Sequence, residues 1–188
     1  MSKPRLLGLS GSLRQGSYST AVLRGLRDAA ADRADIVIHA LDAVPLYNQD
    51  LDTDTPPAGV AALREAIGQA DGVIIVSPEF NYGLPGVLKN ALDWASRPYG
   101  VAKLIAKPVL TATESPAFTG GARAQAPLHD ALHAIGANVI VRPQAVIPAV
   151  HEKVVDGKLI DEATLAFLLG GVDDLIRAAG VRPLAVAA

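Results

Sequence analysis

Five short runs of mainly apolar, often β-branched residues recur along the chain, and none of them alternates between apolar and polar positions. The runs cover residues 6–9, 36–38, 73–76, 109–113 and 139–141. A strand buried on one face alternates, whereas a parallel strand covered by helices on both faces is apolar throughout. The pattern therefore predicts five buried parallel strands.

The segments between these runs carry apolar residues at helical spacing. In the first segment Val22, Leu26 and Ala30 line one face, while charged residues occupy the other. Gly136 is placed to end the fourth helix and Asp161 to begin the fifth. Strand and helix alternate five times, which predicts a doubly wound α/β sheet with helices on both faces. The remaining apolar faces are Leu63, Ala66, Ile67 and Ala70; Leu88, Ala91, Leu92 and Ala95; Leu128, Leu132 and Ile135; and Leu165, Leu168, Leu169, Val172 and Ile176.

Composition narrows the class of protein. The chain has 188 residues, of which 50% are apolar, so we expect one domain spanning 1–188, with 184–188 as a frayed tail. A net charge of −2 argues against nucleic-acid binding, and the absence of cysteine excludes thiolate metal sites and cysteine nucleophiles. No apolar run is long enough for a membrane span and no signal peptide is recognised, so we expect a cytoplasmic protein.

Three connecting segments are long or rich in turn residues. Residues 41–57 carry four aspartates and two adjacent prolines, and residues 77–84 follow the third strand. Residues 150–160 contain Asp156-Gly157, which predicts a turn or short hairpin before the last helix. Open α/β sheets bind ligands beyond the carboxyl ends of their strands, so the loops after strands one, three and four are the candidate binding loops.

The first of these loops, residues 10–19, has the chemistry of an anion cradle. It holds four serines, two glycines and one arginine, and it contains no acid. Glycines let backbone amides turn inward, hydroxyls add donors, and the following helix N-terminus favours negative charge. Ser17 stands where a nucleoside-triphosphate loop needs lysine, and the dinucleotide glycine pattern is missing. A monophosphate fits best, with Arg14 as its bidentate partner.

The second loop, residues 77–84, places two aromatics and an amide at the end of a central strand. Aromatic faces and backbone donors suit a flat heteroaromatic ligand, although aromatics in such a turn can also simply close the core. Trp94 lies at helical spacing from Leu88 and Ala91, so we expect it in the core or at a subunit interface.

Two motifs together carry a family resemblance. Gly11-Ser12-Leu13-Arg14-x-x-Ser17 and Pro78-Glu79-Phe80-Asn81-x-x-x-Pro85-Gly86-x-Leu88-Lys89-Asn90-Ala91-x-Asp93-Trp94 resemble the NADPH-dependent FMN reductase family, which includes chromate, quinone and azo-dye reductases of flavodoxin-like fold. The resemblance extends along almost the whole chain. It implies a five-stranded parallel sheet of order 2-1-3-4-5, bound FMN, and NADPH as co-substrate.

The resemblance also implies which residues bind the cofactor. Those near the phosphate are Ser12, Arg14, Ser17, Tyr18 and Ser19, and those along the ring and ribityl chain are Pro78, Glu79, Phe80, Asn81, Tyr82 and Ser115. Three departures from the family pattern bear on single contacts: Ser19 stands where many members have asparagine, Phe80 replaces the commoner tyrosine, and Pro116-Ala117 alters a stretch often richer in glycine.

The implied reaction passes hydride from NADPH to FMN and then, in a ping-pong cycle, to a small acceptor such as a quinone, a flavin, an azo compound or chromate. No catalytic side chain is implied, because the chemistry belongs to the flavin. Family members are usually homodimers or homotetramers. Tyr47, Asn48 and Asp50 are candidates for a neighbour's contribution to the substrate pocket or for an ordinary surface loop, and the role of Arg123 stays open.

Other functions are weaker interpretations. A non-enzymatic flavodoxin-type electron carrier or flavin-binding regulatory module would share the fold, but carriers tend to be strongly acidic. His129 and His133 have the i, i+4 spacing of zinc ligands without an evident third ligand, so we expect no metal site. A phosphate-binding hydrolase would need a nucleophile or metal that the phosphate loop does not provide.

Overall fold

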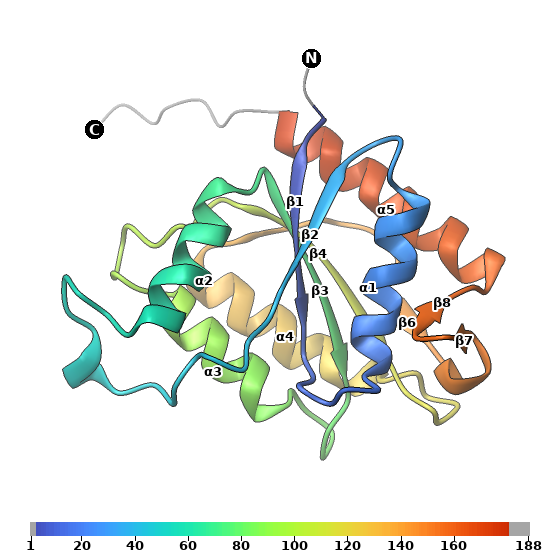
Figure 1. Cartoon of the computed structure of the whole chain (residues 1–188), viewed down its shortest axis with the longest axis horizontal. Coiled ribbons are helices and arrows are strands. Elements are labelled where there is room, and N and C mark those ends of the chain that lie inside the picture. Colours follow the sequence, from blue (N-terminus) through green and yellow to red (C-terminus); the bar gives the residue numbers. More distant parts are fainter. Residues whose placement is uncertain (1–2, 181–188) are drawn as a thin grey trace.

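A computed structural model describes residues 3–180, so the predicted tail at 184–188 lies outside the described residues. Its centre is a parallel sheet of order β2-β1-β3-β4-β5, with β6 also paired to β4 (Figure 1). The order implied by the resemblance is confirmed. The strands are β1 (Arg5–Ser10), β2 (Asp35–His39), β3 (Gly72–Pro78), β4 (Pro108–Glu114), β5 (Asn138–Val139) and β6 (Ala145–Ile147).

Helices cover both faces of the sheet, as the unbroken apolar runs predict. One face packs against α1 and α5 and the other against α2, α3 and α4, which gives two buried hydrophobic clusters (Figure 1). The helices are α1 (Tyr18–Ala29), α2 (Ala58–Gln69), α3 (Gly86–Ala95), α4 (Ala122–Ile135) and α5 (Glu162–Gly180). No helix within residues 3–180 combines the length and apolarity that crossing a bilayer requires.

The predicted helix boundaries at Gly136 and Asp161 are confirmed. Gly136 follows α4 with a left-handed φ of 85°, a conformation that glycine adopts without strain. The Asp161 carboxylate accepts a hydrogen bond from the Thr164 backbone N–H at 2.9 Å, which satisfies a free donor in the first turn of α5.

The fifth predicted strand, 139–141, is wrong in extent. Pairing with β4 stops after Ile140, whose N–H donates to the Val109 carbonyl, and Val141 is fully exposed. Pairing resumes only at β6, three residues beyond Arg142. Pro143 lies in this gap and cannot donate a ladder hydrogen bond, so one strand position is filled by two short strands.

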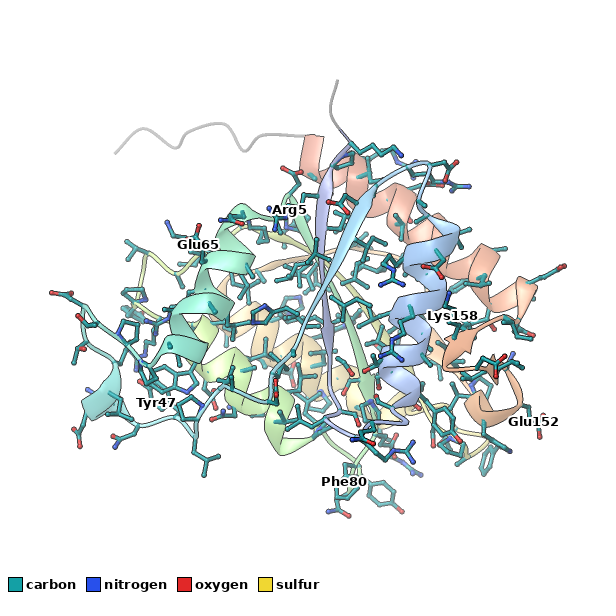
Figure 2. All side chains as sticks on the ribbon, in the orientation of Figure 1. Arg5, Tyr47, Glu65, Phe80, Glu152 and Lys158 are labelled. Carbon is teal, nitrogen blue, oxygen red and sulfur yellow. The ribbon has the colours of Figure 1, made fainter. Side chains whose placement is uncertain are left out.

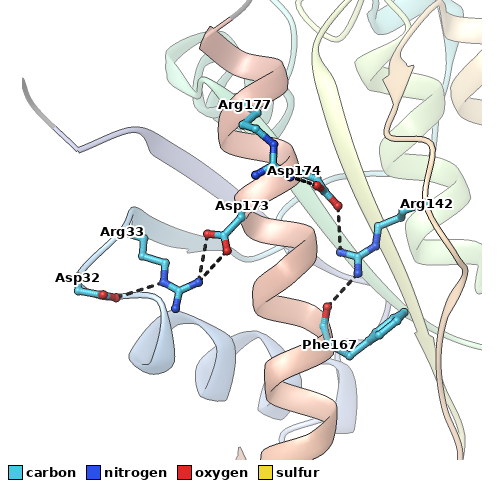
Figure 3. A network of polar contacts seen from close by, with 7 residues as sticks. All are labelled: Asp32, Arg33, Arg142, Phe167, Asp173, Asp174 and Arg177. Carbon is cyan, nitrogen blue, oxygen red and sulfur yellow. Dashed lines mark hydrogen bonds and ion pairs between the residues drawn. The ribbon is translucent and has the colours of Figure 1, made fainter.

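Arg142 holds this interruption against α5 (Figure 3). Its Nη2 donates to the Phe167 carbonyl at 2.9 Å, and its Nη1 lies 3.9 Å from Asp174 Oδ2. A side chain at Gly171 would overlap the guanidinium, so the helix must present bare backbone there. This arginine thereby fixes the interrupted segment to the helix.

The predicted hairpin at Asp156-Gly157 is confirmed. It joins β7 (Val154–Val155) to β8 (Lys158–Leu159), after a short 3-10 helix, η2 (Val150–Glu152). The hairpin packs on α1, and a Cβ at Gly25 would overlap the Leu159 backbone.

The loop between β2 and α2 is anchored on α3 through Trp94. Trp94 is completely buried, and its Nε1 donates to the Pro45 carbonyl at 2.8 Å. The Tyr47 ring meets the indole edge-on at 4.8 Å. The loop also contains a short 3-10 helix, η1 (Gln49–Leu51). Trp94 is therefore a core residue, one of the two roles expected for it.

Candidate functional site

The loops after β1, β3 and β4 meet at the carboxyl edge of the sheet, where the sequence predicted a binding site. Gly11 N–H donates to the Val76 carbonyl at 2.8 Å, which joins the first loop to β3. A Cβ at Gly11 would lie 2.8 Å from Ser77 Oγ and 3.0 Å from Pro78 Cδ. Only glycine allows this approach, so the first loop packs directly on the end of β3.

The phosphate loop, residues 10–19, is ordered by its own hydroxyls. Ser17 caps α1 by accepting from the Thr20 N–H at 3.2 Å. Ser10 Oγ accepts from the Thr20 hydroxyl at 2.9 Å and from the Ser12 N–H at 3.3 Å. These bonds fix the loop at the helix N-terminus, where anions are favoured.

One cationic and one aromatic side chain of this loop contact each other. The Arg14 guanidinium lies over the Tyr18 ring, 5.1 Å from its centroid. Arg14 is exposed and has no carboxylate within ion-pair distance in the described part of the chain, so its charge is available to a ligand. Ser12, Arg14, Ser17 and Tyr18 thus lie together in this loop, and their role in cofactor binding stays a prediction.

Ser19 is the most deeply buried of the loop serines, although Ser10 and Ser17 are also largely buried. It is completely buried, and its hydroxyl donates to Glu114 Oε1 at 2.6 Å. The hydroxyl is therefore engaged inside the protein, and Ser19 lies beneath the phosphate loop and contributes no exposed donor to it.

Glu114 is a site residue that sequence reasoning missed. It ends β4 beside Pro78 of β3, and it is only 3% exposed. Burial raises the pKa of this carboxyl, while the Ser19 hydrogen bond and the Arg14 charge partly oppose the rise. The rule that strand ends carry function could have found it, because it directly follows the fourth apolar run.

The loop after β3 forms a tight turn that presents aromatics to solvent. Phe80 and Gly83 exchange two backbone hydrogen bonds of 3.0 Å, and Asn81 and Tyr82 adopt φ of 50° and 63° between them. Phe80 is 67% exposed and Tyr82 is 70% exposed. Figure 2 shows Phe80 at the border of the molecule. We call residues 79–83 the ring loop, because a flat ligand can stack on these exposed faces.

Glu79 ties the ring loop to the start of α4. Its Oε2 accepts from the Arg123 backbone N–H at 3.0 Å, and its Oε1 lies 3.7 Å from Arg123 Nη1. The Arg123 guanidinium also covers the Tyr82 ring at 4.2 Å. These contacts give Arg123, whose role the sequence left open, a structural position in the site.

The loop after β4 closes the third side of the site. Ser115 N–H donates to the Ile147 carbonyl at 3.1 Å, and Ser115 Oγ accepts from the Ala117 N–H at 3.1 Å. Phe118 on this loop is 91% exposed.

Tyr47, Asn48 and Asp50 lie apart from the ring loop within this chain, as the separation of Tyr47 and Phe80 in Figure 2 shows. Asn48 caps η1 by accepting from the Asp50 N–H at 2.9 Å. His129 Nε2 is hydrogen-bonded to the Thr111 hydroxyl at 2.8 Å. Within residues 3–180 no group of three or more potential metal-binding side chains is found.

Comparison with known proteins agrees with this geometry. The model of a family described as NADPH-dependent FMN reductase matches residues 4–152. The chain belongs to this family. It is 42% identical over 174 residues to a quinone reductase of Escherichia coli K12, covering 89% of this chain and 91% of the relative. It is 35% identical over 159 residues to an NAD(P)H-dependent FMN reductase of Pseudomonas aeruginosa, covering 84% and 85%.

A solved structure matches over nearly the full length. The flavoenzyme NAD(P)H:(acceptor) oxidoreductase FerB of Paracoccus denitrificans superposes with a TM-score of 0.84 at 34% identity, covering 94% of this chain and 97% of FerB. As a member of the NADPH-dependent FMN reductase family, the chain is a flavoprotein oxidoreductase with a flavodoxin-like fold, and it uses FMN and NADPH.

The residues at the sheet edge fit FMN. The phosphate loop supplies hydroxyls, helix-terminal N–H groups and one unpaired guanidinium for a phosphate. The ring loop supplies exposed aromatic side chains for a planar ring. The phosphate loop touches the end of β3 at Gly11, and the ring loop continues directly from that end, so one ligand can span both.

Proposed function

We propose that this protein catalyses electron transfer from NADPH, through FMN bound at the carboxyl edge of the sheet, to a small acceptor of the quinone class. The observation that carries the proposal is the contact of an ordered, acid-free phosphate loop with the end of β3, from which the exposed aromatic turn continues. The name of the Escherichia coli relative, quinone reductase, supports the acceptor class.

In this proposal Ser12, Arg14 and Ser17 hold the phosphate. Their hydroxyls and guanidinium act beside the N-terminus of α1, where the helix dipole adds to the attraction. Ser19 does not contact the phosphate in this proposal. Its hydroxyl donates to Glu114 and so holds the start of α1 against the end of β4.

The ring loop positions the planar part of the cofactor. Pro78 and the backbone of residues 79–82 run along one side, with Ser115 on the other. Bound FMN supplies the chemistry of accepting hydride and passing it on. Backbone N–H groups of the ring loop stabilise negative charge there, and no side-chain acid, base or nucleophile is assigned.

NADPH and the acceptor use the same open face in turn, which makes the cycle ping-pong. Phe80, Tyr82 and Phe118 are exposed around this face and leave it accessible. A wide apolar rim favours flat aromatic acceptors such as quinones over compact ions. Azo compounds, free flavins and chromate are further acceptors in the proposal.

The protein acts as a homodimer or homotetramer in this proposal. Tyr47, Asn48 and Asp50 lie away from the chain's own ring loop, so they are available to a neighbouring subunit's site. Chromatography with light scattering would measure the mass in solution, and a monomer would overturn this part.

An anaerobic reduction tests the central proposal. The purified protein is loaded with FMN, freed of excess flavin, and mixed with one equivalent of NADPH while visible absorbance is followed. We expect rapid bleaching that a quinone reverses, and repeated turnover when NADPH is in excess.

Other outcomes separate the alternatives. Retained FMN that NADPH does not bleach would favour an electron carrier or a flavin-binding regulatory module. A protein that does not retain FMN would overturn the cofactor assignment at this site. Initial rates at several concentrations of both substrates would show parallel double-reciprocal lines for a ping-pong cycle.

A further inference from the structure

Glu114 is a buried acid in a part of the protein that is otherwise suited to an anion. It ends β4 and is 3% exposed, and its strand neighbours, Pro78 on β3 and Ile147 on β6, carry no charge. Within residues 3–180 no basic side chain lies within ion-pair distance of its carboxyl. Burying a carboxylate without a basic partner is costly, so such groups are more typical of functional sites than of an ordinary core.

The carboxyl of Glu114 lies against the first turn of α1, beneath the phosphate loop. Its Oε1 accepts from the Ser19 hydroxyl at 2.6 Å, and Ser19 is two residues beyond the helix cap Ser17. In the proposed function the FMN phosphate uses the same helix terminus from the solvent side, where Arg14 is exposed. Two acidic groups therefore share one helix N-terminus when FMN is bound.

Arg14 is the cation that acts on both acidic groups. Burial raises the pKa of Glu114, and hydrogen bonding by Ser19 together with the Arg14 charge opposes that rise only in part. A phosphate bound to Arg14 engages this guanidinium and brings negative charge close to Glu114. Both changes favour the neutral carboxyl over the carboxylate.

The other charges around the end of β4 are compensated locally or exposed. Side chains alternate along a strand, so Glu114 points, like Ala112, to the face that α1 and α5 cover. Glu79, just beyond β3, pairs with Arg123 at 3.7 Å. The titratable groups on α1, α5, η2 and the hairpin include Tyr18 beneath Arg14, Arg24 at the hairpin, exposed Asp156 and Glu162, and the ion pairs Arg27–Asp28, Lys158–Asp28, His151–Glu152, Lys153–Asp161, Arg33–Asp173, Arg142–Asp174 and Arg177–Asp174. Arg14 and the bound phosphate therefore control the charge state of Glu114.

We propose that Glu114 couples cofactor binding to protonation: FMN binds with this carboxyl neutral, and ionisation of the carboxyl weakens the binding. The inference rests on the proposed function, because it places the FMN phosphate in the phosphate loop. When FMN binds to protein in which Glu114 is ionised, one proton passes from solvent to a Glu114 oxygen, and release of FMN returns it.

Fluorescence titrations with FMN and with riboflavin test the coupling. At each pH between about 5 and 9, the Kd of FMN for the wild-type protein is divided by that for Glu114→Gln, which cancels the titration of the ligand's own phosphate. We expect this ratio to rise from about one at low pH to about tenfold or more at high pH. The ratio for riboflavin, which has no phosphate, should stay near one. Glu152→Gln, which removes an exposed carboxyl on η2, is the matched control and should bind FMN like the wild-type protein at every pH.

A second variant and a direct proton count complete the test. Ser19→Ala keeps Glu114 but removes the hydroxyl that stabilises its ionised form, so the loss of FMN affinity should begin at higher pH. Calorimetry in buffers of different ionisation enthalpy should show the wild-type protein taking up as much as about one proton more than Glu114→Gln on binding FMN.

The outcomes separate this inference from the proposed function. A ratio for FMN that does not change with pH would overturn the inference, as would an equal rise for riboflavin or equal proton uptake by the two proteins. If NADPH still bleaches the bound flavin in that case, the proposed function stands without a role for Glu114. Failure of the wild-type protein to bind FMN at any pH would overturn the proposed function itself.

Discussion

The two ends of the candidate site are built differently. The phosphate loop is internally bonded, with Ser10, Ser17 and Thr20 linked through hydroxyls and a helix cap. The ring loop is held to the rest of the protein through the partly exposed Glu79–Arg123 pair, and its aromatics point into solvent. One end is ordered before the ligand arrives, and the other exposes apolar surface that a ligand can cover.

This difference assigns separate tasks to the two ends. Preformed donors for a phosphate reduce the ordering cost of binding, so the phosphate loop should dominate affinity for FMN. The open ring loop should contribute less to affinity and more to which acceptors reach the flavin. Variants at each end can sharpen or break this division.

The largest effect on FMN affinity is expected at Arg14. Replacing Arg14 with Ala removes a charge-assisted contact worth about 2–3 kcal/mol, so the Kd for FMN should rise roughly 30- to 100-fold. Quenching of flavin fluorescence measures both FMN and riboflavin, and riboflavin, which lacks the phosphate, should be affected far less. An equal loss for the two flavins would contradict the assignment of the phosphate to this loop.

A smaller effect is expected at Glu114, which lies beneath the phosphate loop. Burial raises its pKa in the folded state, so folding favours the protonated carboxyl and stability falls as pH rises through that raised pKa. Glu114→Gln should stabilise the flavin-free protein at pH 7 by roughly 1–3 kcal/mol, because the neutral amide avoids the cost of burying a charge while its oxygen still accepts from the Ser19 hydroxyl. The gain should disappear near pH 4, where Glu114 is protonated in both states.

Urea unfolding between pH 4 and pH 7 measures the free energy of unfolding of the wild-type protein and of Glu114→Gln. Glu65→Gln is the matched control, because that carboxylate lies exposed on α2. If the stability gained in Glu114→Gln does not change with pH, ionisation of the buried Glu114 carboxyl is not what destabilises the wild-type protein.

The smallest effect is expected at the ring loop. Phe80→Leu should weaken FMN binding only about three- to tenfold, the worth of one aromatic contact, and should change unfolding free energy by less than about 0.5 kcal/mol. Tyr99→Leu, at an exposed aromatic outside the site, should leave flavin affinity unchanged. If Phe80→Leu costs more affinity than Arg14→Ala, the proposed division between the two ends is wrong.

Much of this fold could be predicted because its signals are local. Unbroken apolar runs predicted the buried strands, and Asp161 and Gly136 marked helix ends through their own cap geometry. Gly11 and Ser17 could likewise be assigned to the phosphate loop from the residues next to them in the sequence. The order of the strands came from the family resemblance.

The missed features depend on residues far apart in the sequence. Ser19 bonds Glu114 across 95 positions, and nothing near either residue predicts that pair. The segment between β5 and β6 is bonded to α5 by Arg142 and Phe167, which lie 25 residues apart in the sequence.

The interruption between β5 and β6 also disfavours edge-to-edge pairing with another copy of the chain. A long, flat outer strand offers unpaired backbone groups that another chain can extend into a shared sheet. Here the outermost position next to β4 is divided into pieces of two and three residues, with Arg142 and Pro143 between them. An approaching strand finds no continuous row of partners, so this border of the sheet resists intermolecular β-pairing even while the protein is concentrated or newly made.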